Sequence, residues 1–324
     1  MPALSSLLAS RFLKPWWHKG EAPSPPPITT RTASILLVLY ALLYFLPFYA
    51  SSTTRPSPIL SRDAPSVIRA RIRSVLISCF FCLAVTAIIL SNTAGASPSD
   101  ILHLTGIWPP ALLDALRALS LTALLFLGPL FHYFIIDSGW QEWLHLAPFH
   151  ELHSEWTAWR NIVVGPVTEE LLFRSASIPL MLIARTSISK TIFLSPIIFG
   201  LAHVHHFYEF RLTHPEVPAA AAFLRSIFQL TYTTLFGAYA TFLFVRSGSL
   251  LAACVVHAFC NSMGLPKLWG RVRRYSPGLR DEGSASVLWT MAYYVLLVVG
   301  AVSWYQNLWA LTESENALIP ASAF

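Results

Sequence analysis

Long apolar blocks separated by short polar connections dominate the chain. A helix needs about 20 apolar residues to cross the hydrocarbon core of a bilayer, and helices satisfy their own backbone hydrogen bonds inside lipid. The pattern therefore predicts an all-α, polytopic integral membrane protein. About eight transmembrane helices are expected, over residues 33–50, 75–94, 111–136, 160–184, 190–207, 220–245, 248–265 and 286–306.

The apolar blocks also define the domain organisation. Residues 33–306 form the predicted helical membrane domain, in which the segment at 248–265 is short for a full crossing and is expected in the protein interior. Residues 1–32 are basic and rich in proline, a composition typical of a mobile tail. Residues 307–324 form a short C-terminal tail. The sequence shows no internal repeat and no long soluble domain.

Composition supports the membrane class and excludes others. Hydrophobic residues make up 55% of the chain and charged residues only 12%, with a mean hydropathy of +0.56. A disordered chain shows the reverse balance, and an ordinary soluble domain carries about 25% charged residues. All four cysteines lie inside apolar blocks, so no disulfide framework is expected. We interpret Cys79 and Cys82, a C-x-x-C pair, as small buried hydrophobes rather than a metal or redox site.

The net charge of +6 comes mostly from basic residues in the polar connections. We interpret these residues as topology signals and membrane-surface contacts, and expect no nucleic-acid partner. Counted together with Arg160 and Arg225, near the starts of the segments that follow, the connections after the first, third, fifth and seventh segments hold thirteen of the 22 lysines and arginines, against seven on the opposite side. Because cytosolic connections carry the basic excess, these four connections are predicted to face the cytosol. Four basic residues in the N-terminal tail favour the opposite orientation.

Two adjacent carboxylates and an arginine interrupt the fourth segment. Glu170 and Arg174 are four residues apart, so they share a helix face and can form a salt bridge. Glu169 lies about 100° further around the helix and is left to face another group. Carboxylates placed together in apolar surroundings suit a general base working near neutral pH, and Glu169 is the candidate. The alternative for Glu170 and Arg174 is a purely structural pair that holds two helices together.

Histidines and an asparagine interrupt two further segments. Three histidines end the fifth segment, and His203 lies deepest in it, so it is the functional candidate. His205 and His206 are expected at the membrane interface. His257 and Asn261 are four residues apart on one helix face, where both can donate hydrogen bonds to one oxygen atom. A helix–helix hydrogen bond is the alternative for this pair.

Taken together, these residues indicate a catalytic site within the membrane. Ionisable groups in transmembrane segments are costly and mark functional sites. A base, Glu169, a histidine partner, His203, and two oxyanion donors, His257 and Asn261, come from three separate segments. The chemistry therefore favours hydrolysis by an activated water molecule, in a polar cavity enclosed by the helices.

Three short motifs that contain these residues resemble the signatures of a known protease family. They are Glu-Glu-x-x-x-Arg at 169–174, Phe-x-x-x-His at 199–203 and His-x-x-x-Asn at 257–261. The chain thereby resembles the CAAX protease and bacteriocin-processing family of intramembrane proteases, and in particular its eukaryotic, Ras-converting branch. Motif support covers residues 160–265, which we take as the catalytic core. Each motif alone is weak, whereas their order and spacing together are specific.

The resemblance implies an all-helical, glutamate-type intramembrane endopeptidase in the endoplasmic reticulum membrane, with its cavity open to the cytosol. Such enzymes remove the last three residues from farnesylated or geranylgeranylated CAAX proteins, such as Ras-like GTPases. The expected partners are therefore prenylated C-termini and membrane lipid. Carried onto this chain, Glu169 activates the water with help from His203, without a cofactor. The oxyanion site is formed by His257 and Asn261, and the residues that orient it are Glu170 and Arg174.

Three alternatives stay open at this stage. One carboxylate and two imidazoles, from Glu169, His203 and His257, resemble catalytic zinc ligation and would make a zinc-dependent protease with the same site. Against zinc, the chain has no His-Glu-x-x-His motif. Buried glutamates and histidines also form proton relays, which suits a proton-coupled transporter or a non-enzymatic scaffold. Finally, other members of the wider family act on unprenylated peptides.

Overall fold

The computed structural model describes residues 25–274 and 286–324. Over these residues every regular element is a helix, which confirms the all-α prediction. Most of the predicted N-terminal tail lies outside the described residues. Its last residues already belong to the first helix, α2 (Thr30–Phe45), because the Thr29 side chain caps that helix by accepting a hydrogen bond from the Thr32 backbone N–H.

Four helical stretches are long and apolar enough to cross a membrane. They are Thr30–Tyr49, Pro65–Ala94, Ile188–Thr213 and Val287–Asn307. A fifth crossing is formed if the bent pair Leu112–Leu125 and Leu127–Ile136, which meet at 81°, counts as one span. The prediction of several apolar, membrane-crossing helices is confirmed, whereas the count of eight is not.

The remaining predicted segments are helical but differ from simple spans. Residues 160–184 divide into short α-helical and wider π-helical turns: η4 (Trp159–Val164), α10 (Gly165–Glu170), η5 (Leu171–Ala176) and α11 (Ile178–Ile183). Pro166 has no backbone N–H to donate, and the wider turn η4 directly precedes it. The next segment is the long helix α15 (Ala219–Ser247), whose apolar residues are mixed with threonine, tyrosine and glutamine. The predicted short segment is α16 (Leu250–Met263), of 14 residues.

The other elements complete the chain in order. They are η2 (Leu46–Tyr49), α3 (Pro65–Ala94), α4 (Pro98–Leu104), α5 (Leu112–Leu125), α6 (Leu127–Phe131), η3 (His132–Ile136), α7 (Trp140–Leu144), α8 (Ala147–Ser154), α9 (Trp156–Ala158), α12 (Ile188–Phe193), α13 (Ser195–Ala202), α14 (His205–Thr213), α17 (Val287–Asn307), η6 (Ala310–Thr312) and η7 (Ala321–Ala323).

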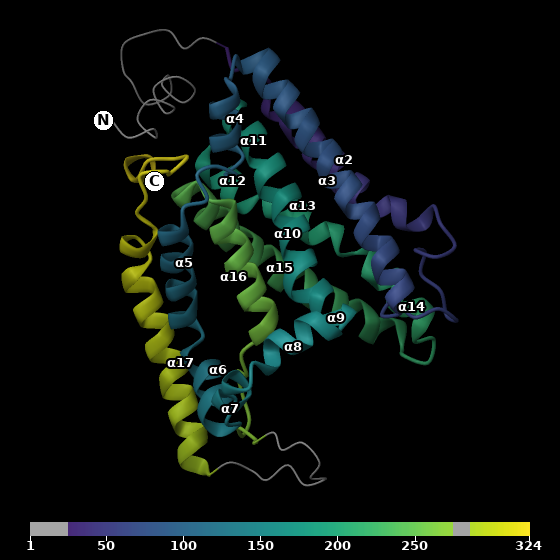
Figure 1. The fold of residues 1–324 in the computed structure, drawn as a ribbon, viewed down its shortest axis with the longest axis vertical. Coiled ribbons are helices and arrows are strands. Elements are labelled where there is room, and N and C mark those ends of the chain that lie inside the picture. The colour runs from purple at the N-terminus through teal and green to yellow at the C-terminus, as the bar shows by residue number, and fades with distance from the viewer. Residues whose placement is uncertain (1–24, 275–285) are drawn as a thin grey trace.

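The helices pack in three groups (Figure 1). The long helices α2 and α3 lie against one another on one side, and α5 and α17 pack together on the other. Between them stand α10, α13, α15 and α16. The predicted site residues lie on α10, η5 and α16 and at the C-terminal end of α13. In the view of Figure 1, α6, α7, α8, α9 and α14 lie in the lower half of the molecule, while α4, α11 and the C-terminus lie in the upper half.

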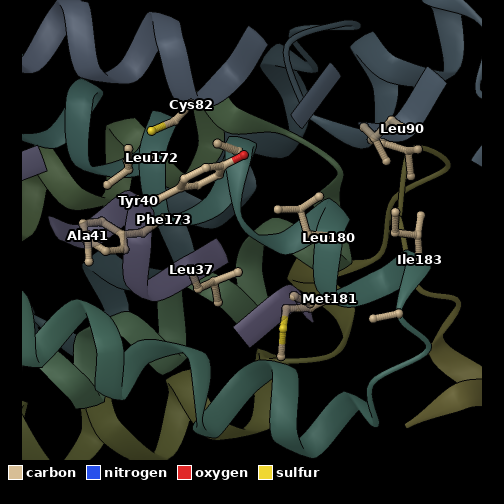
Figure 2. Close-up of a cluster of buried hydrophobic side chains, with 14 of the residues drawn as sticks. Leu37, Tyr40, Ala41, Cys82, Leu90, Leu172, Phe173, Leu180, Met181 and Ile183 are labelled. Carbon is tan, nitrogen blue, oxygen red and sulfur yellow. The ribbon is translucent and has the colours of Figure 1, made fainter. Parts of the chain in front are cut away.

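A cluster of buried apolar side chains joins α2 and α3 to the central helices (Figure 2). On α3, Cys79 and Cys82 are buried as free cysteines, whereas Ile77, Phe80 and Phe81 on the same helix are more than half exposed. An exposed row of large apolar side chains opposite a buried row is the arrangement expected of a helix with one face in lipid. The two cysteines therefore serve as small packing residues, as their apolar setting predicts.

Two glycines let α13 and α15 approach closely. A Cβ atom at Gly200 would lie 2.3 Å from Oγ1 of Thr234, and one at Gly237 would lie 2.8 Å from Cβ of Pro196. Real Cβ atoms do not make contacts this short, so any side chain at these positions would push the helices apart. The close packing places the end of α13, and with it His203, beside the central helices.

Candidate active site

Glu170 is the fixed centre of a buried polar network. Its side chain is completely buried. Oε1 accepts a hydrogen bond from Nη1 of Arg174 at 3.0 Å and a second from Nδ1 of His257 at 2.7 Å. The salt bridge that the i,i+4 spacing predicts is therefore present. The family resemblance implies that Glu170 orients the site of His257, but no local pattern predicts this contact, because the two residues are 87 positions apart in the chain.

Arg174 ties this carboxylate to two other helices. Only 1% of the residue is exposed, and Nη2 donates to the backbone carbonyl of Gly237 on α15 at 3.1 Å. The guanidinium also lies 4.9 Å from the ring centre of Phe199 on α13. A buried charge is tolerated when it is paired and hydrogen-bonded. The Glu170–Arg174 pair thus connects α10, η5, α13, α15 and α16 at one point.

Glu169 occupies a different environment from its neighbour. Its side chain is 21% exposed and lines a cavity, and Oε2 lies 3.9 Å from Nε2 of His257. One carboxylate is therefore held inside the protein while the adjacent one faces open space. This separation follows from the turn of about 100° between consecutive helical residues.

The hydrogen bond to Glu170 also decides how His257 can act. A carboxylate oxygen accepts, so Nδ1 of the imidazole must carry the proton of this bond. Nε2 is then the nitrogen that faces Glu169. Only the doubly protonated ring can donate a hydrogen bond from Nε2, and such a cation would lie between two carboxylates.

His203 lines the same cavity from the C-terminal end of α13. Its Nδ1 donates to the backbone carbonyl of Phe199 at 2.9 Å, and the two rings pack edge to face at 4.9 Å. Because the carbonyl occupies Nδ1, Nε2 of the neutral ring is an acceptor. A histidine fixed in this way can orient a water molecule by accepting one of its hydrogens.

Asn261 reaches the cavity from the last turn of α16, one helical turn after His257. It is exposed, and its Nδ2 donates to the backbone carbonyl of Asn161 on η4 at 2.9 Å. The amide group has two N–H donors, so this contact occupies one and leaves one. The structure thus brings Glu169, His203 and Asn261 together around one cavity, with His257 in contact range of Glu169.

The cavity has a volume of about 180 Å³. Apolar residues from η2 and α3, including Phe48 and Val75, line one side of it. Tyr44 on α2 also lines it, and its hydroxyl lies 2.9 Å from Oγ1 of Thr168 on α10. Beyond the residues that the motifs identify, the wall includes three arginines: Arg62, Arg71 and Arg160.

These arginines are functional candidates that the sequence pattern did not reveal. From that pattern, the basic residues between the first and second segments were interpreted as topology signals and membrane-surface contacts. Arg62 and Arg71 instead converge on Glu209 of α14, a buried carboxylate that accepts from them at 3.3 Å and 2.7 Å. His205 and His206, which were expected only at the interface, also line the cavity. Glu209 lies just beyond the predicted segment 190–207, in a polar stretch with His206 and Arg211, so no local pattern marked it as part of the site.

A metal site needs several donor side chains directed at one position. Within residues 25–274 and 286–324, no group of three or more histidine, cysteine, aspartate or glutamate side chains is placed to hold a metal ion. His257 lies beside Glu169, but its Nδ1 is already bonded to Glu170. Removal of metal from the purified protein is the direct test of the zinc-dependent alternative.

Known proteins resemble this chain over most of its length. A family model described as type II CAAX prenyl endopeptidase Rce1-like matches residues 151–263. Probable CAAX prenyl protease 2 of Schizosaccharomyces pombe is 36% identical over 284 residues, 87% of this chain and 94% of the relative. CAAX prenyl protease 2 of Arabidopsis thaliana is 36% identical over 75% of this chain and 82% of the relative. That of Saccharomyces cerevisiae is 30% identical over 84% and 93%. No solved structure matches the chain at a significant level.

Proposed function

This chain belongs to the Rce1-like family of type II CAAX prenyl endopeptidases, and on that premise we propose that it removes the C-terminal tripeptide from prenylated CAAX proteins, Ras-like GTPases among them. The observation that carries the proposal is the meeting of Glu169, His203 and Asn261 around one cavity in a membrane-embedded helical protein. Each of the three comes from a different helix and from a different one of the three motifs.

The proposed substrate suits this setting. A farnesyl or geranylgeranyl chain partitions into lipid, where it adds about 0.8 kcal/mol of membrane affinity for each buried CH₂ group. The peptide tail that follows the prenylated cysteine is short and extends from the membrane surface. A small polar cavity at one end of a helical bundle can receive such a tail while the lipid chain stays among apolar helices.

Glu169 is the general base of the proposed reaction. It takes a proton from a water molecule that Nε2 of His203 orients, and the water oxygen attacks the scissile carbonyl carbon. The carbonyl oxygen becomes an oxyanion, and the tetrahedral intermediate then breaks its C–N bond. The leaving amine receives the proton from Glu169, which returns the carboxylate to its starting state.

The oxyanion is stabilised by donors from α16. Asn261 contributes its free N–H, and the imidazolium form of His257 contributes Nε2–H. Glu170 supports this role because its carboxylate holds Nδ1 of His257 and balances the cation. Arg174 in turn keeps Glu170 in place through a buried salt bridge. Glu170 and Arg174 are therefore positioning residues that do not touch the substrate.

The proposal also includes location and orientation. CAAX tails are cytosolic, so the cavity must open toward the cytosol of an endoplasmic reticulum membrane. Arg62, Arg71 and Arg160 at the cavity support that orientation, because cytosolic ends of membrane helices carry the basic excess.

The direct test is mass spectrometry of a farnesylated CAAX peptide incubated with the purified protein in lipid vesicles. We expect a mass loss equal to the last three residues, with hydrolysis after the lipidated cysteine. The Glu169→Ala variant is the matched control and should release little tripeptide. Equal cleavage of the same peptide without its farnesyl group would assign the activity to the unprenylated-peptide branch. Proton flux into vesicles without any tripeptide release would support the transporter alternative.

A further inference from the structure

We propose that Arg62 binds the free α-carboxylate at the end of the substrate tail and so sets the distance from the chain end to the cleaved bond. The inference rests on the proposed endopeptidase function and assigns a specificity residue to the same cavity. Arg62 lies just before α3, its side chain is 42% exposed, and it lines the cavity together with Glu169.

Arginines of the cavity wall offer guanidinium donors that can bind an anion. They pair with Glu209 and Asp63, which do not line the cavity, and Glu169 is the single carboxylate among the lining residues. The tail of a CAAX substrate carries one unavoidable anion, its α-carboxylate, which is ionised at neutral pH because α-carboxyl groups have a pKa of about 3.5. Guanidinium groups bind carboxylates through two parallel hydrogen bonds, which fixes the position of the ligand as well as its charge.

Two of the three arginines already use their donors within the protein. Arg71 donates from Nε to the backbone carbonyl of Thr54 at 2.9 Å and from Nη2 to Glu209 at 2.7 Å. The edge of its guanidinium formed by Nε and Nη2 is therefore already occupied. Arg160 donates from Nη1 to Asp63 at 2.8 Å and from Nε to the Asn161 side chain at 2.9 Å. On the guanidinium of Arg160, the Nε–Nη2 edge and the Nη1–Nη2 edge thus each have one nitrogen already hydrogen-bonded within the protein.

Arg62 differs because one edge of its guanidinium, formed by Nε and Nη2, makes no hydrogen bond. Its Nη1 lies 3.3 Å from Oε2 of Glu209 and 3.5 Å from Nδ1 of His206. Nε forms an ion pair with Oδ1 of Asp63 at 3.9 Å, a distance too long for a hydrogen bond. No hydrogen bond from Nε or Nη2 is made to any part of the chain that the structure describes. Glu209 therefore holds Arg62 by one nitrogen and leaves the Nε–Nη2 edge for a ligand.

The length of a three-residue tail limits how far from the cleaved bond its carboxylate can bind. Three extended residues span at most about 10 Å, so the carboxylate must bind within that distance of the bond that water attacks. The cavity wall also includes Ile72 and Val75 of α3, which suit the aliphatic side chains of an aaX tail. A free chain end held by Arg62 would measure out three residues and exclude longer tails.

The test compares two farnesylated CAAX peptides that differ only at the C-terminus, which is a free carboxylate in one and a carboxamide in the other. With wild-type protein in lipid vesicles we expect kcat/KM to be at least about tenfold higher for the free acid, the usual scale for losing a hydrogen bond to a charged group. In Arg62→Gln the acid-to-amide ratio should fall to within about twofold of one. Arg62→Lys keeps the charge without the planar fork, so its ratio should lie between those of the wild type and Arg62→Gln.

Arg55→Gln is the matched control, since Arg55 is an exposed arginine of the same connection that does not line the cavity. Its ratio and its rate should equal those of the wild type. If wild type cleaves acid and amide equally well, the carboxylate inference is wrong while the endopeptidase function stands. If wild type cleaves neither peptide, both proposals are wrong. An unchanged ratio in Arg62→Gln, with wild type preferring the acid, would remove Arg62 from the recognition of the carboxylate.

Discussion

Nδ1 of His257 lies 2.7 Å from Oε1 of Glu170, while Nε2 of the same ring lies 3.9 Å from Oε2 of Glu169. Two adjacent glutamates on α10 thus meet the two nitrogens of one imidazole on α16. Glu170 is fully buried and paired with Arg174, whereas Glu169 is partly exposed in the cavity. The two glutamates therefore differ in role: the carboxylate of Glu170 anchors His257, and that of Glu169 is free to react.

The free carboxylate leads to the first prediction. Glu169→Ala should leave the protein inserted and folded but reduce kcat by at least about a hundredfold, because general-base help contributes about 10²–10⁴. Tripeptide release from a farnesylated peptide gives the rate, and thermal unfolding in lipid gives the control for folding. Equal, mild losses of activity in Glu169→Ala and Glu170→Ala would show that Glu169 is not the base.

The anchoring carboxylate leads to a stability prediction. Glu170→Ala should lower the free energy of unfolding by about 3–5 kcal/mol, since it leaves the buried Arg174 charge without its partner. The midpoint of thermal unfolding in detergent should fall clearly, and fall much further than in Glu169→Ala. An unchanged midpoint in Glu170→Ala would mean that the buried pair contributes nothing measurable to stability.

The role of Asn261 as an oxyanion donor is tested by measuring kcat and KM separately. Asn261→Ala should lower kcat by about 10²–10³, the typical effect of losing one preorganised donor, and should raise KM less. The same variant loses the hydrogen bond to the Asn161 carbonyl, so thermal unfolding should be measured beside the kinetics. Normal turnover in Asn261→Ala would leave this residue with a structural contact only.

Orientation is tested by labelling with a membrane-impermeant thiol reagent in sealed microsomes. Arg271→Cys, in an exposed part of the connection after α16, should be labelled without detergent if this connection is cytosolic. Ser99→Cys, exposed on α4 at the opposite end of the molecule, should be labelled only after detergent is added. The reverse pattern would invert the topology but leave the proposed catalytic residues unchanged.

Metal removal separates the water-activating glutamate from the zinc-dependent alternative. Prolonged treatment with a strong, permeable chelator, followed by removal of the chelator, should leave activity nearly intact. Elemental analysis of the active protein should find far less than one zinc per chain. One zinc per chain, with activity lost on stripping and restored by zinc, would make His203 and His257 ligands and Glu169 a ligand or the base.

Local and periodic features were accessible from the sequence alone. Apolar blocks determine an all-helical membrane protein, because lipid offers the backbone no other hydrogen-bond partners. The four-residue spacing of Glu170 and Arg174 determines their salt bridge, because it follows from the pitch of a single helix. The same logic separates Glu169 from Glu170, since neighbours in a helix point in different directions.

Contacts between helices were decided only by the tertiary structure. No local rule places His257 on Glu170, or Arg62 beside Glu209, across 87 and 147 positions of chain. These contacts depend on how closely helices approach, as at Gly200 and Gly237, and on where connections fold back over the bundle. The number of uninterrupted spans also depended on the fold. π-Helical turns beside Pro166 interrupt one apolar segment, and the 81° bend between α5 and α6 interrupts another. Hydropathy alone shows both segments as continuous. Hydropathy measures only the preference of a segment for lipid, whereas helix geometry and packing determine whether that segment crosses as one straight helix.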